Sequence, residues 1–496
     1  MNPSKSDREH VTLKQGWAQT DITPLQPVFI AGQFHARLSE GVMDPLTATV
    51  WAVQTGEEHV VFASCDLIAI PDDMRDAVRR SLELRRPAGL NPRNVILNAT
   101  HTHTGPEVRV PAPSPGGHAS SEVAGMPILE AMPVQAYMDF AVERIADAVC
   151  KAWSNLEPGA VAYGWGNAVI SHNRRWVNDS GQATMYDLPL SPESRFRHME
   201  GSEDHSLNVI AAYGPEGDLR GLVVNVPCPS QKSEHLFVIS ADWWHETRQL
   251  LRQKYGLGLF VLPQCSAAGD LSPHPLLDRE PYERMLRLKN RTAREEIASR
   301  LVSAIDDIVP CIRDTRRSDM AVKLRSLQLE LPVNRLTERD AQHAEQEANR
   351  WLDVLGDERR KLEERPELRT KERWYVAVSK AYRIAEWHMN VLRRYERQKR
   401  SPTLSAEINV VQLGEVALIT VPYELYMDFG SQMKVRSKAK QTLIVQLAGA
   451  GTYLPSPRSL AGGGYGSVPA SNPIGSEGGQ AIADLVTEQL VRLMGD

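Results

Sequence analysis

The chain has 496 residues, of which 42% are hydrophobic and 24% charged, so it can form an ordinary packed core. Its 57 basic and 62 acidic residues leave a net charge of −5, which argues against broad binding to nucleic acid or acidic membranes. The five cysteines are scattered and odd in number, which favours a reducing cytoplasm over a disulfide framework.

No apolar run approaches the roughly 18 residues that a membrane span needs. Residues 1–10 are polar and lack the apolar core of a signal peptide, so we expect a cytoplasmic protein. The expected partner is a small-molecule substrate. We expect neither nucleic-acid binding nor a transmembrane segment, and the sequence leaves open whether the chain forms a homo-oligomer.

Strand-like and helix-like runs alternate over the first 330 residues. The strand-like runs are apolar and β-branched, and they cover 59–70, 94–103, 221–228 and 258–270. The helix-like runs are amphipathic, and they cover 72–86, 138–153 and 241–256. This alternation predicts an α/β fold of layered mixed β-sheets flanked by helices.

Residues 336–400 interrupt the pattern with dense charge and almost no glycine. Apolar side chains recur every three or four residues on both sides of Pro366, and Thr337 with Asp340 forms a helix-start box. We predict a helical hairpin inserted within a single domain that covers 1–496. Its charge run is most simply a solvated face, and a lid or partner-binding arm is the alternative.

Two strands are expected after the hairpin, at 408–425 and 442–449. A glycine-rich loop follows them, and a final helix is predicted over about 477–494. Long polar loops at strand ends are frequent positions for functional sites.

The first candidate site is "NATHTHTGPE", residues 98–107. Two residues apart on a strand, His101 and His103 would point to the same face. The pair could share a metal ion, or one histidine could bind metal while the other assists the substrate. A pair of structural, hydrogen-bonded histidines is the alternative.

Other candidates lie at the ends of later strands. Glu424 follows a very apolar run, where a carboxylate is costly unless it is paired or bound to metal. Tyr453 ends the next strand, and alone it indicates little. Arg174 could clamp an anion or carbonyl or be surface charge, and Ser272 is most simply part of a capped turn.

Taken in chain order, these stretches resemble the catalytic domain of the neutral/alkaline, non-lysosomal ceramidase family. The resemblance covers about residues 14–494. The matching stretches are "GWAQTDITP", "NATHTHTGPE", "HNRRW", "GDLSPH", "VPYEL" and "GTYLPSPRSLAGGGY".

The resemblance implies a zinc site. Carried over to this chain, His101, Glu424 and Tyr453 match metal ligands, and His103 and Arg174 match residues near the scissile amide. Ser272 matches a serine that has been considered as the nucleophile, for which a zinc-bound water is the alternative.

One departure concerns the fourth ligand. Where the family has a strand-end histidine, this chain reads "VNVPCPSQ", residues 224–231, and Cys228 falls on the expected position if one residue is deleted. A thiolate is a good zinc ligand, but Cys228 could also be an ordinary buried cysteine. His235 or His245 could supply an imidazole instead.

The sequence therefore predicts a zinc-dependent hydrolase that cleaves an amide bond in a small N-acyl substrate through a metal-activated water. One alternative is a metal-dependent enzyme of the same fold that acts on another substrate class, such as a carbohydrate or ester. Another is a non-catalytic binding protein with a decayed site.

Overall fold

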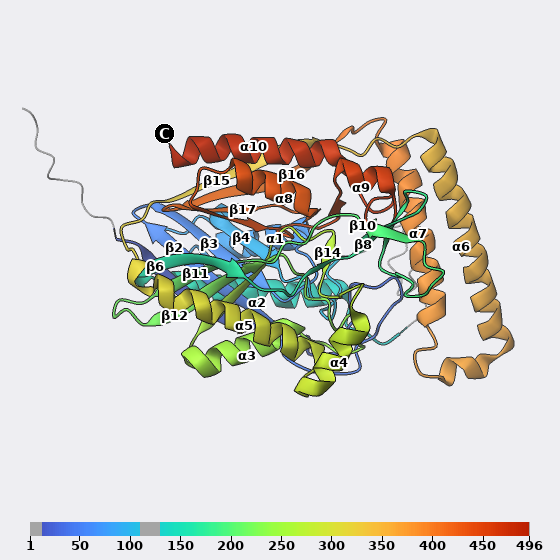
Figure 1. Ribbon diagram of the computed structural model, residues 1–496, viewed down its shortest axis with the longest axis horizontal. Helices are drawn as coiled ribbons and strands as arrows, with labels where there is room; N and C mark the ends of the chain where they lie inside the picture. Colours follow the sequence, from blue (N-terminus) through green and yellow to red (C-terminus); the bar gives the residue numbers. More distant parts are fainter. Residues whose placement is uncertain (1–11, 110–128, 496) are drawn as a thin grey trace, which may run out of the picture.

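The computed structural model describes residues 12–109 and 129–495, which Figure 1 shows in chain colours. The polar stretch 1–10 and both ends of the predicted 1–496 domain lie outside the described residues. Among the described helices, none is long and apolar enough to cross a membrane.

Three sheets form the body of the protein. The first has the strand order β4-β3-β2-β1-β5, the second β13-β12-β11-β6, and the third β15-β16-β17-β19. The first comprises β1 (Lys14–Asp21), β2 (Thr47–Thr55), β3 (Glu58–Cys65), β4 (Val95–Ala99) and β5 (Glu157–Pro158). The second comprises β6 (Ala160–Asn167), β11 (Ser206–Tyr213), β12 (Leu219–Val226) and β13 (Phe260–Cys265). The third comprises β15 (Val322–Pro332), β16 (Thr403–Leu413), β17 (Val416–Thr420) and β19 (Gln441–Val445).

The same succession of elements occurs once in each sheet. Antiparallel strands are followed by a helix that crosses over to one parallel strand, as parallel pairing requires. The parallel pairs are β3–β4, β12–β13 and β17–β19. Their crossover helices are α1 (Asp72–Arg85), α3 (Trp243–Tyr255) and α8 (Met427–Arg436).

The inner faces of the three sheets share one hydrophobic core. Trp51 of β2, Ile210 of β11 and Leu418 of β17 are all fully buried in it. Helices cover the outer faces: α1 and α2 (Val134–Ser154) lie on the first sheet, α3 and α5 (Ala293–Ile312) on the second, and α8 and α10 (Ser476–Met494) on the third (Figure 1). The predicted fold class of layered mixed sheets flanked by helices is confirmed.

Side chains at the ends of the parallel strands tie the sheets together. Nδ2 of Asn98 on β4 donates to the carbonyl oxygen of Pro263 on β13 at 3.2 Å. Nδ2 of Asn225 on β12 donates to the carbonyl oxygen of Ile444 on β19 at 2.7 Å. The loops that follow these strands therefore lie close together, at the carboxyl ends where α/β sheets usually bind ligands.

The smaller elements surround these loops. They are the strands β7 (His172–Asn173), β8 (Arg175–Asn178), β9 (Ala183–Met185), β10 (Phe196–Met199), β14 (Leu271–Ser272), β18 (Glu424–Leu425) and β20 (Tyr453–Leu454), and the helices α4 (Arg279–Lys289) and α9 (Pro457–Gly462).

The predicted helical hairpin consists of α6 (Glu338–Glu364) and α7 (Val376–Arg397), and it stands at one end of the sheets (Figure 1). Thr337 caps α6 through the expected box with Asp340. The hairpin leaves the third sheet after Pro332 and rejoins it at Thr403, and these two residues pair directly across β15 and β16.

The prediction of one strand over 408–425 is wrong. β16 ends at Leu413 and β17 begins at Val416, because Gly414 adopts a φ of +59° and reverses the chain. Gly414 and Glu415 mark this turn in the sequence, but the prediction joined the apolar runs on both sides of them into one strand.

Candidate active site

Histidine and threonine alternate over residues 101–104, after β4, and the two residue types face different surroundings. The hydroxyls of Thr102 and Thr104 donate to the carbonyl oxygen of Ser240 at 2.8 and 2.9 Å. The intervening rings of His101 and His103 approach each other, with their Nε2 atoms 3.3 Å apart. His101 has a φ of +63°, a backbone conformation that non-glycine residues rarely adopt and that is frequent at functional sites.

The Nε2 atom of His101 presents a lone pair to Nε2 of His103. Nδ1 of His101 lies 2.8 Å from the carbonyl oxygen of Ile68, which can only accept, so Nδ1 carries the proton and Nε2 a lone pair. Nδ1 of His103 lies 3.2 Å from Oε2 of Glu234, although without the alignment of a full hydrogen bond. Oε2 of Glu424 lies 3.5 Å from Nε2 of His101. Two acceptor atoms, Nε2 of His101 and Oε2 of Glu424, thus lie together next to Nε2 of His103, and a proton of His103 or a cation must lie among them.

Glu424 and Tyr453 are held side by side, because β18 pairs in parallel with β20 and these two residues are in register. Nη2 of Arg174 lies 3.9 Å from Oε2 of Glu424 and 3.3 Å from the Tyr453 hydroxyl. Burial opposes ionisation of Glu424, but His101 and Arg174 lower its pKa to about 2. Burial raises the pKa of Tyr453 well above its ordinary value.

The Arg174 guanidinium is fixed at both of its terminal nitrogens. Its Nη1 donates to the Tyr186 hydroxyl at 2.9 Å, its Nη2 donates to the carbonyl oxygen of Gly269 at 2.8 Å, and its backbone N–H donates to Asp270. The cation also lies near the rings of Tyr186 and Tyr453, at 5.4 and 5.5 Å from their centroids. Arg174 is 2% exposed, so it presents a permanent, preorganised positive charge inside the site.

Glu234 is a site residue that the sequence reasoning missed. Its Oε2 lies 3.2 Å from Nδ1 of His103, and its Oε1 lies 3.4 Å from Nε2 of His274. Burial opposes its charge, but the two histidines hold its pKa well below the ordinary value. Burial lowers the pKa of His103, which leaves a neutral imidazole backed by a carboxylate.

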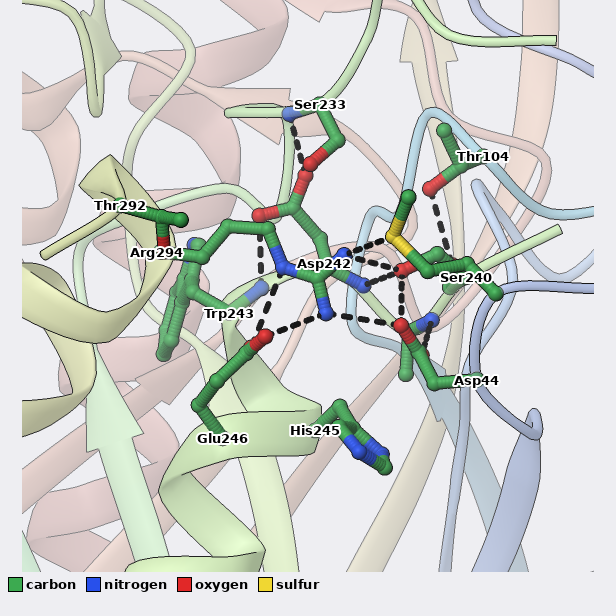
Figure 2. A network of polar contacts seen from close by, with 12 residues as sticks. Asp44, Thr104, Ser233, Ser240, Asp242, Trp243, His245, Glu246, Thr292 and Arg294 are labelled. Atoms are coloured by element: carbon green, nitrogen blue, oxygen red, sulfur yellow. Dashed lines mark hydrogen bonds and ion pairs between the residues drawn. The ribbon is translucent and has the colours of Figure 1, made fainter. Parts of the chain in front are cut away.

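A polar network holds the segment that carries Glu234 (Figure 2). Oδ2 of Asp242 accepts from the backbone N–H of Ser233 at 2.6 Å. Arg294 of α5 pairs with Asp44 at 2.7 Å, and Asp44 in turn accepts from the Ser240 hydroxyl. These buried contacts fix both ends of the 233–242 segment, so the carboxylate beside His103 is positioned by packing that lies away from the site.

The hairpin borders the site through aromatic rings. Trp387 of α7 lies with its ring centroid 6.0 Å from that of Tyr465, and Tyr465 lies 5.4 Å from Tyr453. Phe34 packs edge-on against Trp387 at 5.2 Å. The hairpin therefore forms one wall near the site, and its action as a lid stays an interpretation.

Tyr186 lies between Ser272 and the histidine pair. Its Oγ accepts from the backbone N–H of His274 at 3.1 Å, as in a capped turn, and it also bonds the Tyr186 hydroxyl. Among the described residues, no imidazole bonds this hydroxyl, so Ser272 lacks the adjacent base that a serine nucleophile requires.

The three candidates for the fourth ligand lie apart from the histidine pair. Cys228 is buried, its Sγ donates to the carbonyl oxygen of Ile170 at 3.2 Å, and burial raises its thiol pKa well above the ordinary value. His235 is exposed, and His245 bonds a glutamine of its own helix α3. Within the described part of the chain, no contact joins any of the three to His101.

The chemistry of the remaining donors fits a zinc ion. His101 supplies an imidazole lone pair, Glu424 a carboxylate and Tyr453 a phenol oxygen, all of which zinc or a similar metal can bind. Over residues 12–109 and 129–495, no group of three or more histidine, cysteine, aspartate and glutamate side chains is arranged as a metal site. A metal bound here would therefore need the tyrosine as a ligand.

Asp270 is buried next to Arg174, and we expect its carboxyl group to make the stability of the protein depend on pH. Burial raises its pKa from near 3.8 to about 6, although its Oδ1 accepts from the Met427 backbone N–H. A raised carboxyl pKa means that the folded state favours the protonated carboxyl group. The protonated Asp270 therefore contributes its full stabilisation below about pH 4, and this stabilisation is lost as the pH rises through about 6. A rise of this size in the pKa corresponds to roughly 3 kcal/mol in the free energy of unfolding.

We therefore expect Asp270→Asn to unfold like the parent at pH 4 and to be up to about 2 kcal/mol more stable at pH 7.5. Urea unfolding at both pH values measures this difference. A variant that is less stable at pH 7.5 would show that the ionised carboxylate stabilises the fold.

Solved structures provide the comparison for this architecture. The chain superposes on neutral ceramidase from Pseudomonas aeruginosa with a TM-score of 0.66 and 15% sequence identity, over 97% of this chain and 74% of the other. A structure of ceramidase complexed with C2 gives a TM-score of 0.64 at 15% identity, over 98% of this chain and 75% of the other. In sequence, the chain matches no family model and no curated protein.

The chain therefore has a neutral-ceramidase fold, and the predicted resemblance is confirmed at the level of the fold. Identity of 15% leaves activity and substrate to the residues of the site.

Proposed function

We propose that this protein is a metal-dependent hydrolase that cleaves an amide bond of a small N-acyl substrate, with zinc held by His101, Glu424 and Tyr453. One observation carries the proposal: the acceptor atoms of His101 and Glu424 lie together, next to His103 and beside the fixed guanidinium of Arg174. The fold shared with neutral ceramidase supports an amide as the bond that is cleaved.

The surrounding residues supply the proton transfers and the charge stabilisation. Arg174 donates hydrogen bonds to the substrate carbonyl oxygen and stabilises the negative charge that develops on it. His103, neutral because burial lowers its pKa, accepts a proton from the attacking water at Nε2 and delivers it to the leaving nitrogen. Glu234 faces the opposite nitrogen and stabilises the imidazolium between these two transfers. When bound, zinc would add Lewis acidity that polarises a carbonyl and acidifies water.

Water, and not Ser272, is the nucleophile in this proposal. The Ser272 hydroxyl already bonds Tyr186 and the backbone of His274. His103, the neutral base of the site, faces His101 and Glu234 instead. Ser272→Ala should therefore retain measurable hydrolysis.

Metal analysis of the purified protein tests the ligand set. We expect about one zinc ion per chain in the parent and close to none in Glu424→Gln, because the amide removes the anionic ligand. Cys228→Ala is the matched control, since the Cys228 thiol donates to Ile170 and, among the described residues, makes no contact with His101, and it should keep its metal. Zinc retained by Glu424→Gln, or absent from the parent, contradicts the ligand assignment.

Assays with short N-acyl amides test the reaction independently of the metal. Hydrolysis should depend on Arg174 and fall by about 100-fold or more in Arg174→Met, a loss typical for an oxyanion-stabilising group. A zinc-loaded protein that leaves all such amides intact would point to another substrate class on the same fold.

A further inference from the structure

A cavity of about 590 Å³ lies directly beside the proposed site. Tyr186, Glu234 and His274 form part of its wall. Tyr186 accepts from Arg174, and Glu234 faces His103, so the cavity is separated from the reacting groups by single side chains. Tyr186 and Glu234 thus belong both to the cavity and to the site, and a ligand in the cavity lies within one side chain of Arg174 and His103.

Two cations with unusual surroundings line this cavity. Lys232 is half-buried, with its Nζ 3.3 Å from Nδ1 of His274 and 3.4 Å from the carbonyl oxygen of Pro273. Arg279, also half-buried, donates to backbone carbonyl oxygens, including that of Leu276 at 3.2 Å. Among the described residues, neither cation has a carboxylate within ion-pair distance.

The acidic residues of the cavity do not neutralise these cations. Glu234 is engaged by two histidines, and Asp187 and Glu283 are exposed to solvent at the cavity wall. Burial lowers the pKa of Lys232, although Asp242 and Glu234 act in the opposite direction, and its Nζ lies 5.2 Å from the ring centroid of Tyr282. A half-buried cation without a counter-ion is costly, and an anionic ligand would offset that cost.

We infer that the substrate carries an anionic group beside its amide, a carboxylate in the simplest case, which binds to Lys232 and Arg279. N-acyl amino acids are the class that combines these features, and the inference rests on the proposed amide hydrolysis. The carbon–nitrogen bond breaks while water adds its hydroxyl to the acyl carbon and its proton to the nitrogen. The products are a carboxylic acid and an amino acid.

Two amides of equal chain length, N-hexanoylglycine and N-hexanoylethanolamine, test the inference because only the first carries a carboxylate. We expect Lys232→Met and Arg279→Met each to raise KM for N-hexanoylglycine about tenfold, because each substitution removes one charge-assisted hydrogen bond. Neither substitution should change KM for N-hexanoylethanolamine. Arg284→Met, on an exposed position of the same helix as Arg279, is the control and should change neither.

Calorimetric titration with N-hexanoylglycine separates this inference from the proposed reaction. Binding that weakens about tenfold in both variants, without hydrolysis by the parent, would support the anion site and refute the amidase. Hydrolysis of both amides that is insensitive to Lys232 and Arg279 would refute the anion site and leave the amidase standing. A parent that binds N-hexanoylglycine no more tightly than the ethanolamine amide overturns the inference.

Discussion

Glu234→Gln is expected to lower kcat for the proposed amide hydrolysis by about 100-fold, the low end of what a positioned acid–base pair contributes. Glutamine keeps the size of the side chain but removes the charge that faces Nδ1 of His103 at 3.2 Å. The imidazolium that forms when His103 accepts a proton then lacks its carboxylate partner. KM should change little, since Glu234 acts through His103.

The pH profile distinguishes this positioning role from a general structural defect. Glu234 raises the pKa of His103 against the lowering effect of burial, so its removal should move the acid limb of kcat to lower pH. Glu283→Gln removes an exposed carboxylate from the same cavity and should leave the profile unchanged. An acid limb that stays in place in Glu234→Gln would exclude coupling between Glu234 and His103.

Arg248→Met should lower the free energy of unfolding by about 3–5 kcal/mol, the usual cost of leaving one partner of a buried ion pair alone. Asp66, at the end of β3, is fully buried and accepts from both Nη atoms of Arg248 at 2.8 and 2.9 Å. Because Arg248 belongs to α3, this pair joins the first sheet to a helix of the second. Chemical denaturation monitored by tryptophan fluorescence measures the loss.

A double variant tests whether the unpaired charge is the cause. Arg248→Met combined with Asp66→Asn should be more stable than Arg248→Met alone, because no isolated carboxylate remains buried. Gln249→Met, an exposed neighbour on α3, should change the stability by less than about 0.5 kcal/mol. A loss below about 1 kcal/mol in Arg248→Met would show that water reaches Asp66.

Local signals in the sequence predicted the features that depend on few residues. The box of Thr337 and Asp340 begins α6, because a cap is made within one helical turn. The i, i+2 spacing of His101 and His103 predicted a shared face on a strand, which is wrong, because β4 ends at Ala99 and His101 has a φ of +63°. The two rings meet in the loop after β4 instead, and the structure also brings Glu424 next to them.

Features that depend on the return of distant segments could not be read from the sequence. Glu234 reaches His103 because hydrogen bonds from Thr102 and Thr104 to Ser240 hold the two segments together, and no spacing signal marks such a contact. The arrangement of three sheets around one core could not be read from the sequence for the same reason. The burial pattern of a strand specifies which of its faces is buried, but not which sheet packs against that face.

Because Pro332 pairs directly with Thr403, the helical hairpin can be replaced as one unit. Its ends are adjacent, so recombination or design could replace α6 and α7 by a different insert, or by a tight turn, without changing the strand register. The segment that would change carries Trp387, which contacts Tyr465 near the site. A change at this one insertion point would therefore alter a wall near the proposed site, while the strand ends that carry the site residues stay unchanged.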